Sequence, residues 1–178
     1  SDLERGRRPG SYQDQCDLIR LVGALNVLHS ASAAPVEALD LPAETRHMDA
    51  YYANITLTDK VFLGRGIGQQ RITAAIAMAA IARGTTPEKL DGDPAIMTVI
   101  NVNSPRRVDV EMIAGLTEMV THGQPPIITP FTLMGAMTPV TMAGALAQHN
   151  AEAQALIAYT QLLPADAPDI KGDITSNV

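Results

Sequence analysis

Residues 126–147 have the sequence PIITPFTLMGAMTPVTMAGALA, and this stretch decides the predicted fold. Its short apolar run at 127–128 ends at a Thr-Pro pair, as a buried strand does. Thr138 is a candidate N-cap, and Pro139 suits the first turn of the long alanine-rich helix that follows. The stretch therefore predicts a strand, a polar loop and a helix that begins beside the loop. In α/β proteins that corner is where ligands bind.

Strand-like and helical segments alternate along the rest of the chain. We expect strands near residues 26–29, 60–63, 95–100, 126–128 and 168–174. We expect helices near residues 12–24, capped by Ser11, and near 43–55, 69–83, 108–122 and 139–163. This alternation predicts a single α/β domain over residues 1–178, with about five parallel βα repeats. The pattern alone is compatible with a doubly wound sheet and with part of a (β/α)8 barrel.

The composition argues against several classes of protein. The net charge is −6, and no basic run exceeds Arg7-Arg8, so we expect no nucleic-acid binding. Cys16 is the single cysteine, which excludes an intrachain disulfide and suits a reducing cytoplasm. No stretch approaches the roughly 20 apolar residues of a membrane span, and the charged N-terminus does not resemble a signal peptide. The sequence therefore predicts a cytoplasmic protein that binds neither membranes nor nucleic acid.

Polar side chains follow the third predicted strand. Asn101, Asn103 and Ser104 come just after it, at what should be the C-terminal edge of a parallel sheet. Their amides and hydroxyl can orient a polar ligand, although the same residue types also commonly cap turns and helices. His29 ends the first predicted strand, at the same predicted edge. Both the ligand-binding and the structural interpretation of these residues remain open at this point.

Two other kinds of site are less well supported. Residues 64–68 have the sequence GRGIG between a strand and a helix, which invites a dinucleotide-binding interpretation. The spacing is not G-x-G-x-x-G, however, and Asn101 stands where an acid is expected after the next strand. We therefore favour an ordinary βα loop. No set of His, Cys, Asp and Glu has metal-ligand spacing, so no metal site is predicted.

Several segments resemble the trimethylamine methyltransferase (MttB) family. The resemblance lies in residues 129–141 (TPFTLMGAMTPVT), 101–105 (NVNSP), 5–10 (RGRRPG) and 175–178 (TSNV). It runs the whole length of the chain, but family members are much longer, so we expect an internal piece of one. The resemblance implies a TIM (β/α)8 barrel, of which this chain supplies part, because a complete barrel needs about 250 residues.

The resemblance also implies a function. Members of the family are corrinoid-dependent methyltransferases of methylamine metabolism and methanogenesis. They move a methyl group from a methylated amine, such as trimethylamine or a betaine-like quaternary amine, to the cobalt of a corrinoid protein. The corrinoid (cobalamin) is thus carried by a partner, with no cofactor bound directly. The residues of this chain contain no pyrrolysine; the type without it is the expected one, and the resemblance leaves both substrate and subtype open. The expected substrate-binding residues are His29, Asn101, Asn103, Ser104, Thr129, Phe131 and Thr132.

Two further expectations concern the donor and the assembly. The N-terminal dipole of the helix after Pro139 suits the carboxylate of a betaine better than the cation of a simple methylamine. Part of a barrel has open sheet edges and an uncovered apolar face, which predicts a homo-oligomer. The isolated chain is expected to be inactive. The alternatives are a non-catalytic barrel fragment or binding module, and a dinucleotide-dependent α/β enzyme.

Overall fold

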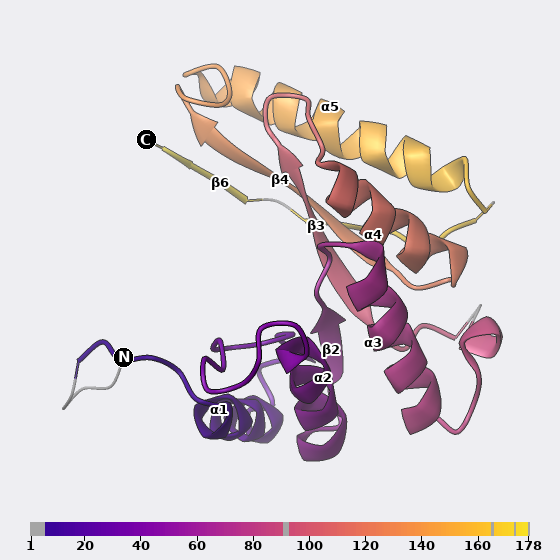
Figure 1. Cartoon of the computed structure of the whole chain (residues 1–178). Coiled ribbons are helices and arrows are strands. Elements are labelled where there is room, and N and C mark those ends of the chain that lie inside the picture. Colours follow the sequence, from indigo (N-terminus) through magenta and orange to yellow (C-terminus); the bar gives the residue numbers. More distant parts are fainter. Residues whose placement is uncertain (1–5, 91–92, 165, 173, 178) are drawn as a thin grey trace. The chain divides into compact units, whose positions relative to one another are not determined.

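Parallel strands alternate with helices in the structure, as in part of a (β/α)8 barrel, which confirms the predicted fold class. The structure is a computed structural model that describes residues 6–90, 93–164, 166–172 and 174–177 (Figure 1). The chain divides into two compact units, residues Ser1–Gly64 and Arg65–Val178. Each unit is described by itself below. The expectation of a single domain over residues 1–178 stays a prediction.

The first unit contains two helices and two short strands. They are α1 (Tyr12–Ala24), β1 (Ser30–Ala31), α2 (Arg46–Leu57) and β2 (Val61–Gly64). The two strands pair in parallel, with Ser30 opposite Val61. Cys16 and Ile19 of α1 pack against Ala53 of α2 and form a small buried core. These side chains hold the two helices of the unit together.

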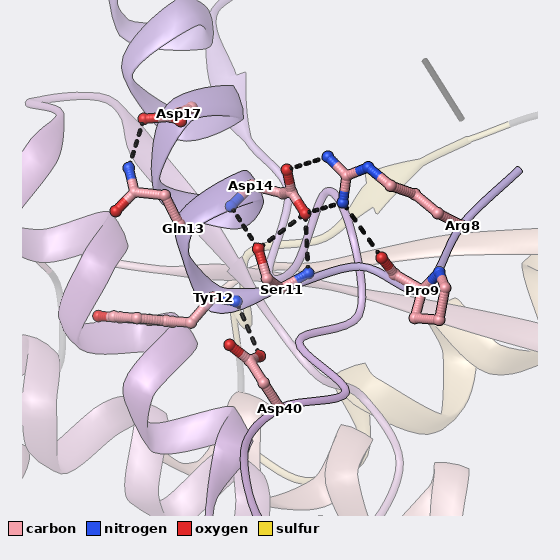
Figure 2. Close-up of polar contacts among 8 residues, drawn as sticks. All are labelled: Arg8, Pro9, Ser11, Tyr12, Gln13, Asp14, Asp17 and Asp40. Atoms are coloured by element: carbon pink, nitrogen blue, oxygen red, sulfur yellow. Dashed lines mark hydrogen bonds and ion pairs between the residues drawn. The ribbon is translucent and has the colours of Figure 1, made fainter. Parts of the chain in front are cut away.

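Helix α1 begins where the sequence predicts, at Ser11. The Ser11 hydroxyl accepts from the Asp14 N–H, and the Asp14 carboxylate accepts from the Ser11 N–H, which together form a capping box (Figure 2). Arg8 donates to both oxygens of the same carboxylate (Figure 2). These hydrogen bonds lower the pKa of Asp14, the Arg8 contact having the largest effect.

The strand predicted at residues 26–29 is wrong, because β1 begins at Ser30. The segment before it instead makes a turn in which the Leu28 N–H donates to the Leu25 carbonyl. The Lys60 ammonium then donates to the carbonyls of Val22, Leu25 and Leu28 at 2.5–2.7 Å. These carbonyls are therefore held by a lysine that is distant in sequence, rather than by a neighbouring strand.

The second unit contains the remaining helices and strands of the described chain. Its elements are α3 (Gln69–Ala82), the 3-10 helix η1 (Pro87–Leu90), β3 (Met97–Asn103), α4 (Val110–Thr121), β4 (Pro126–Met134), α5 (Met142–Gln161), β5 (Ile170–Lys171) and β6 (Ile174–Asn177). Strand β4 pairs in parallel with β3, β5 and β6. The predicted parallel arrangement of the strands near 95–100, 126–128 and 168–174 is confirmed.

Helices α4 and α5 pack on β3 and β4 (Figure 1). The core between these two layers is aliphatic, and its buried members are Ile100, Val102, Leu116, Val120, Ile128, Ala153, Leu156 and Ala167. Side chains along a strand point alternately to its two faces. Ile100, Val102 and Ile128 therefore define the face of the sheet that is turned toward the helices, and the odd-numbered residues of β3 and β4 lie on the opposite face.

Strand β4 is longer than predicted, since it continues through Pro130 to Met134. A proline normally interrupts a central strand because it has no N–H to donate. Here the pairing of β4 with β5 covers Ile127 and Ile128, and the pairing with β6 starts at Phe131, so Pro130 lies between the two. The carbonyl of Pro130 accepts a hydrogen bond from Nε2 of the buried His149 on α5, at 3.0 Å.

Helix α5 begins later than predicted. Its N-cap is Thr141, whose hydroxyl accepts from the Gly144 N–H, and not Thr138. Thr138 is buried and closes the turn after β4, where its carbonyl accepts from the N–H of Gly135. A glycine at position 135 suits this turn because its φ is 87°. Within the described ranges, no helix combines the length and hydropathy that crossing a membrane requires.

Candidate functional site

The face of β3 and β4 that is turned away from the helices carries most of the predicted site residues. Asn101 pairs with Thr129 in the parallel register, and Asn103 pairs with Phe131. Partners in a parallel register lie side by side on the same face of the sheet. The structure therefore brings Asn101, Asn103, Thr129 and Phe131 together near the C-terminal edge of two adjacent strands, where α/β proteins bind ligands.

Asn101 is oriented by its neighbour. The Thr129 hydroxyl donates to the side-chain carbonyl of Asn101 at 2.8 Å. Because this bond occupies the oxygen end of the amide, the NH₂ end of the exposed Asn101 side chain is free to donate outward. Within the described part of the chain, no acceptor takes this NH₂ group. Thr129 itself is buried, so the pair presents a fixed amide donor at the surface of the sheet.

Phe131 and Asn103 lie beside this pair, one step nearer the strand ends. Phe131 is 42% exposed, which is unusual for a phenylalanine in the middle of a paired strand. The Asn103 amide donates to the Asp109 carboxylate at 3.2 Å, and that contact links the end of β3 to the N-cap residue of α4. The face therefore combines an amide donor with an accessible aromatic ring.

Close approach of Gly172 limits the space behind Thr129. The Gly172 N–H donates to the Ile128 carbonyl at 2.9 Å. A Cβ atom at position 172 would collide with the methyl group of Thr129, so a residue without a side chain is required there. A larger residue at position 172 would therefore displace the Thr129 side chain.

Three predicted site residues lie elsewhere. Thr132 is one residue out of phase with Thr129 and Phe131, so it is buried on the helix-facing side of β4. The Ser104 hydroxyl is buried and donates to the carboxylate of Glu152 on α5. His29 belongs to the first unit, where it is exposed just before β1. A substrate-binding role for these three residues stays a prediction.

The glycine-rich loop at 64–68 has a structural explanation. A Cβ atom on Gly66 would collide with the Val99 carbonyl, and a Cβ atom on Gly115 would collide with the Gly66 carbonyl. Glycine at these two positions lets the loop pack closely between β3 and α4. The Gly68 N–H donates to the Glu111 carbonyl, also on α4, at 3.1 Å. These contacts support the interpretation of an ordinary βα loop.

The sequence reasoning did not single out Gln148 and Glu152 of α5, which contact the loops beside this face. One signal was available, because Glu152 is the only acidic or basic residue among the 20 of α5, apart from His149. A single carboxylate in an alanine-rich helix often faces a specific partner. Among the described residues, no group of three or more His, Cys, Asp and Glu side chains is placed to hold a metal ion.

The chain is similar to known proteins over nearly its whole length. A family model described as trimethylamine methyltransferase (MTTB) matches residues 1–178. The glycine betaine methyltransferase of Desulfitobacterium hafniense (strain Y51) is 29% identical over 175 residues, which cover 98% of this chain and 36% of that relative. The chain thus spans about a third of the length of the curated relative that it matches.

Proposed function

Because the chain belongs to the trimethylamine methyltransferase family, we propose that the protein containing it demethylates a quaternary amine and passes the methyl group to the corrinoid of a separate partner protein. The similarity to a glycine betaine methyltransferase supports a betaine-like donor. The reduced cobalt of the partner supplies the nucleophile. The residues of this chain then have to bind the donor, orient its methyl group and exclude water.

One observation carries the choice of donor, namely the fixed amide of Asn101 beside the exposed ring of Phe131. An amide NH₂ group donates to a carboxylate, and an aromatic face attracts a quaternary ammonium group. A betaine has both groups within one small molecule, whereas trimethylamine has no carboxylate. The pair of contacts therefore favours a carboxylate-bearing quaternary amine.

The two contacts have different consequences for the reaction. During transfer the methyl–nitrogen bond breaks and its electron pair stays on nitrogen, so the cationic ammonium becomes a neutral amine. The attraction of Phe131 for the cation is strongest before transfer, so it contributes to binding more than to the rate. The bond from Asn101 to the carboxylate is present throughout and fixes the direction in which the methyl group points.

The test is methyl transfer by the full-length protein, with reduced corrinoid protein and either glycine betaine or trimethylamine as donor. We expect turnover of glycine betaine to exceed that of trimethylamine. Replacing Asn101 by Ala removes the amide donor, and replacing Thr129 by Val removes the hydroxyl that orients it. Each change should lower kcat/KM for glycine betaine tenfold or more, about 1.4 kcal/mol of transition-state stabilisation, with little change in Tm.

Matched controls are Asn150→Ala, an exposed position on α5, and Thr121→Val, an exposed position at the end of α4. Both controls should retain the kcat/KM of the wild type. Unchanged turnover in the Asn101 and Thr129 variants would place the donor site elsewhere. Absence of methyl transfer from any methylated amine would favour a non-catalytic role for the protein.

A further inference from the structure

Two side chains one turn apart on α5 connect the loops that follow β3 and β4. We name these loops, residues 104–109 and 135–141, the rim loops. Gln148 donates to the Met137 carbonyl at 3.0 Å and to the Glu152 carboxylate at 2.9 Å. That carboxylate also accepts from the Ser104 hydroxyl and, at 2.8 Å, from the Arg106 N–H. One continuous set of hydrogen bonds therefore joins both rim loops through α5.

The buried charge of Glu152 needs a reason beyond stability. Its residue is 5% exposed, and removing a carboxylate from water costs several kcal/mol unless hydrogen bonds compensate. Its three donors provide that compensation. Apolar residues of α5 such as Ala153 and Leu156 already pack on the sheet, so holding α5 in place does not itself require a charge. An apolar residue could not bind Ser104 and Arg106, however.

The rim loops leave the same edge of the sheet as the candidate site. In the first loop, Asn103 and Arg107 exchange two backbone hydrogen bonds, at 2.7 and 3.2 Å. In the second, the Gly135 N–H donates to the Thr138 carbonyl at 3.0 Å. Each loop is thus closed on itself, and the bonds from α5 fix it relative to the sheet. A methyl acceptor has to approach a donor bound on this face past that edge.

We propose that Glu152, together with Gln148, is a positioning residue that couples the two rim loops and holds them in the arrangement required for methyl transfer. This inference rests on the proposed function. Glu152 does not contact the donor. The donor is bound by Asn101 and Phe131, which lie on strands that pair directly with each other. Loss of Glu152 should therefore lower kcat while leaving KM for the donor nearly unchanged, because small misplacements of the reacting groups slow transfer strongly.

The experiment uses the Glu152→Gln variant of the full-length protein. Glutamine keeps the size of the side chain but is neutral, so the hydrogen bonds to Ser104 and to the Arg106 N–H lose the charge that strengthens them. We expect kcat with glycine betaine to fall at least tenfold and KM for glycine betaine to stay within threefold of the wild type. Hydrogen exchange of the Arg106 amide, measured under native conditions, should accelerate at least tenfold. Gln148→Leu, which cuts the link to Met137, should change kcat in the same direction by a smaller factor.

Glu118→Gln is the matched control, because the Glu118 carboxylate of α4 likewise accepts side-chain hydrogen bonds from another element, here from Gln69 and Thr73 of α3. It should lower Tm without changing kcat. A Glu152→Gln variant with kcat within twofold of the wild type, despite faster Arg106 exchange, would overturn the positioning role. If Glu152→Gln does not fold, Ser104→Ala is the test, with the same criteria. If the wild-type protein transfers no methyl group, the proposed function is wrong, whatever the role of Glu152 in the loops. If hydrogen exchange of the Arg106 amide is unchanged in Glu152→Gln, the proposed coupling of the rim loops is wrong.

Discussion

Asp14 shows how much one half-buried carboxylate can organise. It accepts from Arg8 and from both the N–H and the hydroxyl of Ser11, and so joins the segment before α1 to the first turn of that helix (Figure 2). All of these partners favour the ionised form, and they lower its pKa, the Arg8 contact most of all. A carboxylate whose pKa is lower in the folded than in the unfolded state makes folding more favourable once it is ionised.

Replacing Asp14 by Asn should therefore make the free energy of unfolding depend less on pH in the acidic range. The contribution of Asp14 is fully present above its unfolded pKa of about 4 and is lost as the pH falls through the lower pKa of the folded state. Urea unfolding of wild type and variant between pH 7 and pH 2 measures the difference. We expect the wild type to be more stable at pH 7 and the gap to shrink below pH 4. A gap that is independent of pH would show that the carboxylate acts only through its shape.

At the scale of elements, one end of a helix can be capped by a neighbouring residue and the other end by a residue far away in the sequence. Helix α1 begins with a local capping box. Near its C-terminal end, the Lys60 ammonium donates hydrogen bonds to the carbonyls of Val22, Leu25 and Leu28. A cation at a helix C-terminus interacts favourably with the helix dipole and with carbonyls that have no partner within the helix. The same contact shapes the turn that precedes β1.

Lys60→Met tests this contact, because methionine keeps much of the apolar stem and removes the charge and the donors. We expect a loss of about 1–2 kcal/mol in the free energy of unfolding, together with faster hydrogen exchange at the end of α1. Urea unfolding and exchange measured by mass spectrometry provide the readouts. Lys89→Met, at an exposed lysine of η1, is the control and should change stability by less than about 0.5 kcal/mol. Equal effects of the two substitutions would contradict the assignment.

At the scale of the whole molecule, a buried polar side chain holds several backbone segments together within the second unit. This side chain is Gln124, whose amide is fully used. Its oxygen accepts from the N–H groups of Ala95 and Ile96, and its nitrogen donates to the carbonyls of Leu90 and His122. These bonds fix the segment that leads into β3. Self-association of the chain, which the sequence suggests, stays a prediction at this scale.

Gln124→Leu leaves buried backbone groups unpaired and should cost about 3 kcal/mol. The partners of Gln124 and those of Lys60 belong to different units. We therefore expect the double variant with Lys60→Met to lose the sum of the two single effects, to within about 0.5 kcal/mol. Urea unfolding of the four proteins gives the cycle. An interaction energy above about 1 kcal/mol would show that the two units are energetically coupled.

The sequence by itself determined the helices, the parallel βα alternation and the family. Helices follow from periodic apolar residues and from local caps such as Ser11, and these interactions lie within a few positions along the chain. The placement of Asn101 and Thr129 on adjacent strands also followed from the alternation, because parallel strands end at a common edge. Such features depend on short-range order, which a sequence shows directly.

Only the tertiary structure decided where strands end and which polar groups meet. Strand β4 passes through Pro130 because this residue lies between the stretches that pair with β5 and β6, and its carbonyl accepts from His149, 19 positions later. A turn stands before β1 in place of the predicted strand, because the carbonyls of this segment accept hydrogen bonds from Lys60, which is more than 30 residues away in the sequence. Glu152 reaches Ser104 across 48 positions. A buried polar group requires a hydrogen-bond partner, but the local sequence pattern does not identify that partner. The packing of the whole chain decides which residue it is.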